Sequence, residues 1–258
     1  MKISVVTTTR CCASTIGDCL ASFASQSHLD REQIVIDAAS QDGTLEILQA
    51  HRDQLAVLVS ESDRGIYDGL NKGIARASGE VIGFLHGDDV FAGPDTLASV
   101  AAAFSDPNVE AVYGDLVYVS REDSHRVIRH WRAGEYRRSR LRWGWAPPHP
   151  TLYARRSLYD RIGGFDLRYR IAGDYDLMLR LLMRLSGRVV YLPEVLVRMR
   201  VGGVSNQSLR HLLQKSWEDY RILRANAVGG VLALAWKNLS KLPQFVVSSR
   251  RTPSRRSR

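Results

Sequence analysis

The segment Glu80-Val-Ile-Gly-Phe-Leu-His-Gly-Asp-Asp89 decides the fold expected for this chain. Its apolar run, residues 81–85, has the length of one buried strand in a parallel sheet. Asp88 and Asp89 follow after His86-Gly87, and Gly93-Pro94 can then restart the chain as a helix. Open α/β sheets bind ligands beside the carboxyl ends of their strands, where paired carboxylates can hold Mg²⁺ or Mn²⁺ against phosphates. The segment therefore predicts a metal site, unless the pair only caps the next helix.

Apolar strands and amphipathic helices alternate through residues 1–119. Strands are expected at residues 2–6, 33–37, 55–59, 81–85 and 111–118, and a helix follows each of the first four. This alternation predicts an α/β fold with a Rossmann-like, mostly parallel central sheet flanked by helices. Acidic residues follow three strands: Asp37, Asp63 and the pair at 88–89. Each alone is better explained as a helix cap, but their convergence on one sheet edge favours a ligand site.

The pattern changes after residue 119. Strands are expected at 151–154 and 189–200, and helices at 157–162, 174–185, 209–225 and 228–247. Asp174 stands at the start of one of these helices, where a cap is the simplest role for an isolated aspartate. Asp176 precedes Arg180 by four residues, a spacing that favours an ion pair along one helix face.

The amino-acid composition is that of an ordinary globular protein. The chain has 258 residues, of which 45% are hydrophobic and 24% charged, with a net charge of +9. The positive charge is concentrated at residues 121–142 and 237–258, and the remainder is mildly acidic. No apolar run approaches the roughly 20 residues that a membrane span needs, and the first residues indicate a strand, not a signal peptide. The three cysteines, Cys11, Cys12 and Cys19, are expected to be reduced, which fits the cytoplasm.

Several motifs together carry a family resemblance. Asp37-Ala-Ala-Ser-Gln-Asp-Gly-Thr44, Asp63-Arg-Gly-Ile-Tyr-Asp68 and His86-Gly-Asp-Asp89 resemble family 2 glycosyltransferases, and the second block resembles the branch that builds colanic acid and other exopolysaccharides. Later matches are His149-Pro-Thr151, Gly163-Gly-Phe-Asp166, Ala172-Gly-Asp-Tyr-Asp176 and Gly202-Gly-Val-Ser205. The resemblance covers residues 2–206 and implies a GT-A fold, with a nucleotide-binding half at 1–119 and an acceptor half at 120–206.

The resemblance also implies a reaction and a site. Such enzymes transfer a sugar from a UDP- or GDP-sugar to an acceptor hydroxyl with inversion, assisted by Mn²⁺ or Mg²⁺. The resemblance assigns metal binding to Asp89, with Asp88 beside it, and the role of catalytic base to Asp174. Side chains expected around the nucleotide-sugar are Thr7, Arg10, Asp37, Asp63, Asn71, Lys72 and Asp88, and those on the acceptor side are His149 and Tyr67.

The sequence pattern of residues 207–247 predicts a helical C-terminal extension, and residues 248–258 are expected to form a disordered basic tail. Residues 228–247 have apolar side chains at helical spacing, with Lys237 and Lys241 on the polar side. This pattern is typical of a helix lying on an anionic membrane surface, and equally of a helix packed on its own domain or on a second subunit. The first interpretation places the protein at the inner face of a bacterial plasma membrane, acting on a lipid-linked glycan.

Three other functions remain open at this stage. A sugar-nucleotide pyrophosphorylase also pairs an α/β sheet with metal-binding carboxylates, but it usually opens with a glycine-rich phosphate loop, and residues 7–12 contain no glycine. A nucleic-acid-binding module would use the arginine patches, but aromatic residues among them are few and the acidic strand ends would repel phosphate, so no nucleic-acid partner is expected. A homologue that binds the donor without turnover is the third.

Overall fold

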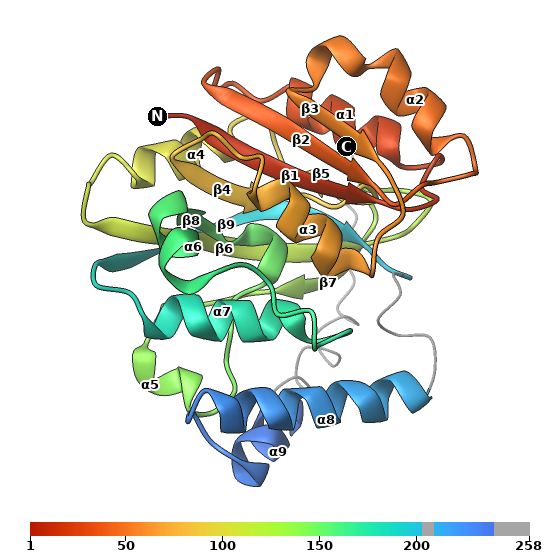
Figure 1. The fold of residues 1–258 in the computed structure, drawn as a ribbon. Coiled ribbons are helices and arrows are strands. Elements are labelled where there is room, and N and C mark those ends of the chain that lie inside the picture. Colours follow the sequence, from red (N-terminus) through yellow and green to blue (C-terminus); the bar gives the residue numbers. More distant parts are fainter. Residues whose placement is uncertain (203–208, 240–258) are drawn as a thin grey trace, which may run out of the picture.

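The computed structural model describes residues 1–202 and 209–239, whose arrangement is shown in Figure 1. Among these residues, nine strands form one sheet in the order β3-β2-β1-β4-β8-β6-β9-β5, with β7 also paired to β6. The strands are β1 (Ile3–Thr9), β2 (Arg31–Asp37), β3 (Val57–Ser60), β4 (Val81–Phe84), β5 (Val90–Phe91), β6 (Val109–Val119), β7 (Val127–Trp131), β8 (Tyr153–Arg155) and β9 (Arg188–Arg200). The helices are α1 (Ile16–Ala24), α2 (Thr44–Ala50), α3 (Ile66–Ile74), α4 (Thr96–Ala103), α5 (Arg138–Leu141), α6 (Arg156–Ile162), α7 (Gly173–Met183), α8 (Leu209–Ala225) and α9 (Val231–Leu239). Two short 3₁₀ turns, η1 (Arg52–Gln54) and η2 (His149–Thr151), complete the described elements.

The first half of the sheet is parallel. β1 pairs in parallel with both β2 and β4, and β2 pairs in parallel with β3. The connections pass through helices, which lets successive strands run in the same direction. The register aligns Thr9 with Asp37 and Asp37 with Ser60. The residues that follow these strands therefore meet at one edge of the sheet.

The second half adds antiparallel pairs to the predicted sheet. β8 lies between β4 and β6 and is antiparallel to both, whereas β9 is parallel to β6 and antiparallel to β5. The strand expected at 151–154 begins later than predicted, because residues 149–151 form the η2 turn. The hydroxyl of Thr151 fixes this turn by donating to the carbonyl oxygens of Pro148 and Gly114, each at 2.9 Å.

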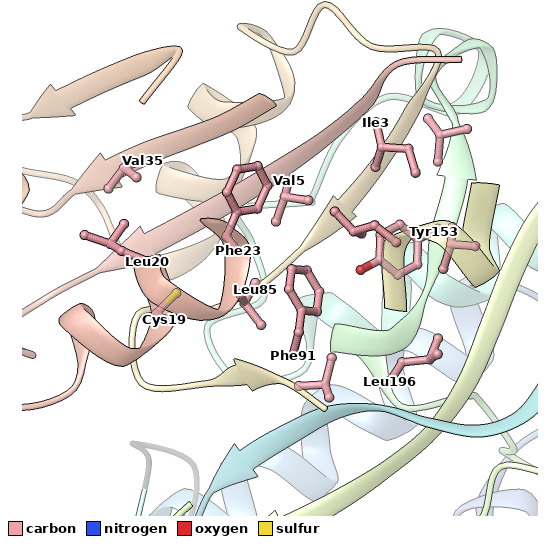
Figure 2. Close-up of a cluster of buried hydrophobic side chains, with 14 of the residues drawn as sticks. Ile3, Val5, Cys19, Leu20, Phe23, Val35, Leu85, Phe91, Tyr153 and Leu196 are labelled. Carbon is pink, nitrogen blue, oxygen red and sulfur yellow. The ribbon is translucent and has the colours of Figure 1, made fainter. Parts of the chain in front are cut away.

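Apolar side chains fill both faces of the sheet. One cluster packs α1 and α4 against the strands, and Figure 2 shows Leu20 and Phe23 of α1 near Val5, Val35 and Leu85. The second cluster packs α3, α6 and α7 on the other face. Between these two layers, every residue of β4 is buried.

Helix α7 is buried on two sides, and Figure 1 shows it between the sheet and α8. Leu177 and Leu181 join the cluster on the sheet, whereas Leu179 and Leu182 join a third cluster with residues of α8 and α9. The C-terminal helices therefore pack on the domain itself, through α7.

The predicted helix at 228–247 begins at Val231, and the described part ends at Leu239. The prediction that Lys237 lies on an outward polar face is wrong. Its Nζ lies 2.6 Å from Oδ1 of Asp219 in α8 and 3.1 Å from the ring centre of Tyr175 in α7, and the residue is 5% exposed. Lys241, residues 203–205 of the last family motif and the tail at 248–258 lie outside the described residues.

Two other sequence predictions can be compared with the structure. All three cysteines are free thiols, as expected. Burial raises the pKa of the Cys12 thiol to about 11, which keeps it protonated and unreactive. Within residues 1–202 and 209–239, no helix has both the length and the apolar character needed to cross a bilayer.

Candidate active site

The end of β1 brings a different threonine to the site from the one that the sequence suggested. β1 continues to Thr9, and side chains alternate along a strand. Thr7 consequently points into the core, where Gln33 Nε2 donates to its Oγ1 at 3.0 Å. Thr8 points to the opposite face, with its Oγ1 3.1 Å from Nδ1 of His86. The structure therefore does not bring Thr7 to the strand-end edge, and Thr8 occupies that place.

Asp37 ends β2 and is enclosed by hydrogen-bond donors. Its Oδ1 accepts from the hydroxyls of Thr9 and Ser40 at 2.8 and 2.5 Å, and its Oδ2 accepts from the Ser60 hydroxyl and the Ser40 amide at 2.7 and 3.0 Å. Burial opposes ionisation, but the bonds from Ser40 and Ser60 outweigh it and lower the pKa of Asp37. The carboxylate is therefore a fixed anion that ties three neighbouring strand ends together.

The carboxylate pair that follows β4 does not cap a helix. β5 begins directly after Asp89, and the cap position of the next helix, α4, is Asp95. Asp89 is 1% exposed, and its Oδ1 accepts a 3.1 Å bond from the Arg200 amide. Its Oδ2 is buried and has no hydrogen-bond partner among the described residues. Burial and the neighbouring charge of Asp88 both raise the pKa of Asp89.

A buried carboxylate oxygen without a partner is costly, and either a bound cation or a proton would satisfy it. Oxygen ligands suit Mg²⁺ and Mn²⁺, so the residues present fit a divalent metal. The described chain contains no group of three or more His, Cys, Asp or Glu side chains that could enclose an ion by themselves. Asp89 and Asp88 would therefore supply part of the coordination shell, and substrate phosphates and water would supply the rest.

Asp174 faces this edge from the first turn of α7. It does not cap the helix, because Ala172 occupies the cap position and the helix begins at Gly173. The side chain is half-buried, and its Oδ1 lies 3.4 Å from the hydroxyl of Tyr67, which donates to the Ile171 carbonyl at 2.7 Å. The backbone at Gly173 passes so close to the Tyr67 ring that a Cβ there would press on it. Tyr67 thus fixes the start of α7 and the carboxylate on it.

Two histidines lie within electrostatic range of Asp174. His149 of η2 is buried and stacks on Phe84 with ring centres 4.9 Å apart, and its Nε2 has no hydrogen-bond partner among the described residues. Burial lowers the pKa of His149 to about 4, so the ring is neutral at pH 7. His86 lies 6.2 Å from it between ring centres. Burial also lowers the pKa of His86, against the opposing charges of Asp88 and Asp174.

These charge effects show that the two acidic groups share one region. Asp88 and Asp174 both act on the ring of His86. Burial raises the pKa of Tyr118 in β6, and the charges of Asp89 and Asp174 add to that shift. The carboxylates that follow β4 and the carboxylate on α7 therefore lie within electrostatic range of the same two side chains, His86 and Tyr118.

The remaining predicted residues follow β1 and β3 or lie on α3, and they have different roles. Asp63 is half-buried and accepts from the Gly65 amide at 3.0 Å, while Arg10 is exposed after β1. Asn71 uses its amide on the backbone of Phe165, donating at 2.9 Å and accepting at 2.7 Å. Lys72 lies 2.8 Å from Glu61, and that ion pair raises the pKa of Lys72. In this structure Asn71 joins α3 to the loop between α6 and α7, and Lys72 joins it to the loop after β3.

Sequence patterns missed two residues that hold the site. Arg200 ends β9 and donates from its guanidinium to the Asp88 carbonyl at 2.8 Å, besides its amide bond to Asp89. Glu218 of α8 accepts from the amides of Ile171 and Ala172, each at 2.9 Å, and of Arg170 at 3.2 Å. Both lie far along the chain from their partners, so spacing carried no signal of them. The expected pair of Asp176 with Arg180 is present, at 2.7 Å.

The curled α/β sheet, its flanking helices and the acidic strand ends define a GT-A glycosyltransferase fold. Residues 4–163 match the family model "Glycosyl transferase family 2", and the chain belongs to that family. It is 31% identical over 208 residues to a PGL/p-HBAD biosynthesis glycosyltransferase of Mycobacterium bovis, covering 79% of this chain and 78% of the relative.

Two solved structures share the fold. Staphylococcus aureus TarS 1-349 in complex with UDP-GlcNAc has a TM-score of 0.70 at 19% identity, covering 96% of this chain and 79% of that one. The mannosyltransferase PcManGT from Pyrobaculum calidifontis, in complex with GDP-Man and Mn²⁺, has a TM-score of 0.65 at 22% identity, covering 95% and 73%.

Proposed function

We propose that this chain is an inverting, metal-assisted glycosyltransferase that moves a sugar from a UDP- or GDP-sugar to an acceptor hydroxyl. The observation that carries the proposal is the presence of acidic groups from two separate elements in one region. Asp89 has a buried, unpartnered Oδ2 after β4, Asp174 projects from α7, and the charges of both act on Tyr118. The nucleotide sugars in the two similar solved structures support the donor class.

The acidic residues after β4 and the aspartate on α7 have separate chemical tasks. A nucleoside diphosphate gains negative charge as it leaves, and a divalent cation, when bound, would neutralise that charge. Asp89 and Asp88 would hold the cation. Asp174 accepts the proton of the acceptor hydroxyl, which attacks the sugar from the face opposite the diphosphate. Tyr67 keeps the start of α7 in place, so the base stays oriented during the reaction.

The proposed acceptor is a lipid-linked glycan at the inner face of a bacterial plasma membrane. The net charge of +9 favours an anionic surface, and the similar mycobacterial glycosyltransferase acts in PGL/p-HBAD biosynthesis. No structural observation favours the pyrophosphorylase or the nucleic-acid module.

The experiment uses the purified full chain with a panel of UDP- and GDP-sugars, with and without Mn²⁺. Thermal shift measures donor binding, and release of nucleoside diphosphate measures turnover. Asp174→Asn should lower turnover by about 10²–10⁴-fold while unfolding temperature and donor affinity stay unchanged. Asp160→Asn on α6, an exposed carboxylate, is the matched control. Wild-type turnover in Asp174→Asn would refute the base assignment, and donor binding without turnover in the wild type would identify an inactive homologue.

A further inference from the structure

A solvent-facing apolar surface joins α9 to the loop after α5. On α9, Val231, Leu232 and Trp236 are 67%, 80% and 55% exposed, and Trp143 beside them is 54% exposed. The rings of Trp143 and Trp236 meet edge to face, with centres 6.1 Å apart. We name these four residues, together with Arg138 and Arg142, the α5–α9 surface.

The opposite side of α9 is fixed to the domain. Lys237 is buried in its ion pair with Asp219, and Ala233 is buried in the cluster that contains α7 and α8. The backbone of Gly144 lies against the Lys237 side chain, so closely that a Cβ there would overlap it. Because these contacts fix the rotation of α9 about its axis, the face that carries Leu232 and Trp236 cannot turn inward. It is therefore a stable part of the molecular surface.

Two arginines lie near the residues that lead into α9, Ala227 and Val228. Arg138 and Arg142 line a depression whose apolar wall includes Leu141 and Val228. The Arg138 guanidinium is held at the rim by its 3.0 Å bond to the Met183 carbonyl. Further exposed arginines on α5, its flanks and α8 are Arg137, Arg140, Arg221 and Arg224.

We infer that the α5–α9 surface docks on a bilayer that contains anionic phospholipid. Tryptophan side chains favour the boundary between head groups and acyl chains, where an apolar ring and a polar N–H are both satisfied. Arginines beside them match lipid phosphates in charge and geometry. A second copy of the chain is a poorer occupant, because a two-fold contact would bring the arginine clusters of both copies together. The biological role of this docking rests on the proposed lipid-linked acceptor, but binding of the surface to anionic lipid does not depend on the glycosyltransferase reaction.

The test measures binding of the full chain to vesicles by cosedimentation. Phosphatidylcholine vesicles with and without phosphatidylglycerol are compared at low and high salt. Wild-type protein should bind only the anionic vesicles, and high salt should weaken binding. Trp143→Ser combined with Trp236→Ser should weaken it at least about tenfold, through loss of the inserted rings. Arg138→Gln combined with Arg142→Gln should weaken it about thirtyfold, from about 1 kcal/mol for each charge near the surface.

Matched controls separate this surface from general effects. Trp217→Ser removes a tryptophan that is 61% exposed on α8, and Arg76→Gln removes an exposed charge beyond α3. Both should bind vesicles like the wild type. Equal binding by the Trp143/Trp236 variant, or an equal loss in the Trp217 control, would overturn the inference. A concentration-dependent dimer that the same double variant abolishes would instead assign the surface to a second copy.

A nucleotide measurement on the same samples keeps the two proposals apart. Thermal shift with UDP, GDP and Mn²⁺ should be unchanged in every surface variant, since none of these residues belongs to the acidic site. Absent vesicle binding with an intact nucleotide shift would refute the docking surface alone. Vesicle binding without any nucleotide shift would count against the glycosyltransferase proposal alone.

Discussion

Glu218→Gln tests whether the C-terminal helices shape the acceptor side of the site. The buried Glu218 carboxylate accepts the amides of Arg170, Ile171 and Ala172, which lie just before Asp174. The Ile171 carbonyl in turn accepts the Tyr67 hydroxyl. Glu218 is therefore expected to act as a positioning residue: it does not touch the reacting atoms, but it holds the turn from which the base projects.

The free energy lost on substitution follows from the backbone amides that donate to the Glu218 carboxylate. A glutamine has one carbonyl oxygen, which can keep the two bonds now made to Oε2, while its amino group faces the Arg170 amide. Bonds to a charged group are worth about 1.5–3 kcal/mol and neutral ones about 0.5–1.5, so each retained bond weakens by about 1 kcal/mol. The unpaired Arg170 amide adds about 1 kcal/mol more, whereas the partly exposed Gln214 side chain, which now donates to Oε1 at 3.1 Å, can bond to water instead. A local loss of about 3 kcal/mol is below the usual stability of a domain, so the variant should fold.

Amide hydrogen exchange measures this loss without any knowledge of the substrate. A loss of about 3 kcal/mol should speed exchange at Ile171 and Ala172 about 100-fold, because each 1.4 kcal/mol is a factor of ten. Diphosphate release should fall about tenfold or more at unchanged donor affinity, since small displacements of a catalytic group are costly.

Asp219→Asn is the matched control, because it removes a buried charge from the next residue of the same helix. Asp219 pairs with Lys215 and Lys237 and makes no bond to residues 170–172. This variant should lose overall stability but keep slow exchange at Ile171 and Ala172. Equal acceleration in both variants, or none in Glu218→Gln, would refute the reasoning.

Two further predictions concern the acidic edge and the buried histidine. Asp89→Asn should abolish any Mn²⁺-dependent thermal shift with UDP or GDP. Without metal, the variant should unfold at the same or a higher temperature than the wild type, because the substitution removes a buried anionic oxygen that lacks a partner. A large drop in the metal-free unfolding temperature would contradict this. His149 stays neutral in the folded protein down to its pKa of about 4, whereas the unfolded chain takes up that proton near pH 6.5. Its contribution to stability is complete above pH 6.5 and declines by about 3 kcal/mol as the pH falls toward 4. Urea unfolding from pH 4 to 8 should show that slope in the wild type and a shallower one in His149→Gln, and equal slopes would exclude His149 as the cause.

The sequence alone determined the parts of this protein that depend on neighbours close in the chain. Alternating apolar strands and helices predicted the parallel half of the sheet, and the four-residue spacing predicted the pair of Asp176 with Arg180. The position of the carboxylates after buried strands predicted that acidic groups would gather at one edge. These features follow from hydrogen-bond geometry and from periods of two and 3.6 residues, which every short segment carries within itself.

Only the tertiary structure decided which side chains complete the site and which face of α9 meets solvent. The choice of Thr8 over Thr7 became clear only with β1 extended to Thr9, since neighbouring side chains along a strand point to opposite faces. Glu218 accepts hydrogen bonds from a turn more than forty residues earlier in the chain. Lys237 points inward because it forms an ion pair with the buried Asp219 on the adjoining helix. Such pairings stabilise the fold through contacts between distant segments. No local pattern encodes them, because the energy of each depends on burial that exists only after the chain has folded.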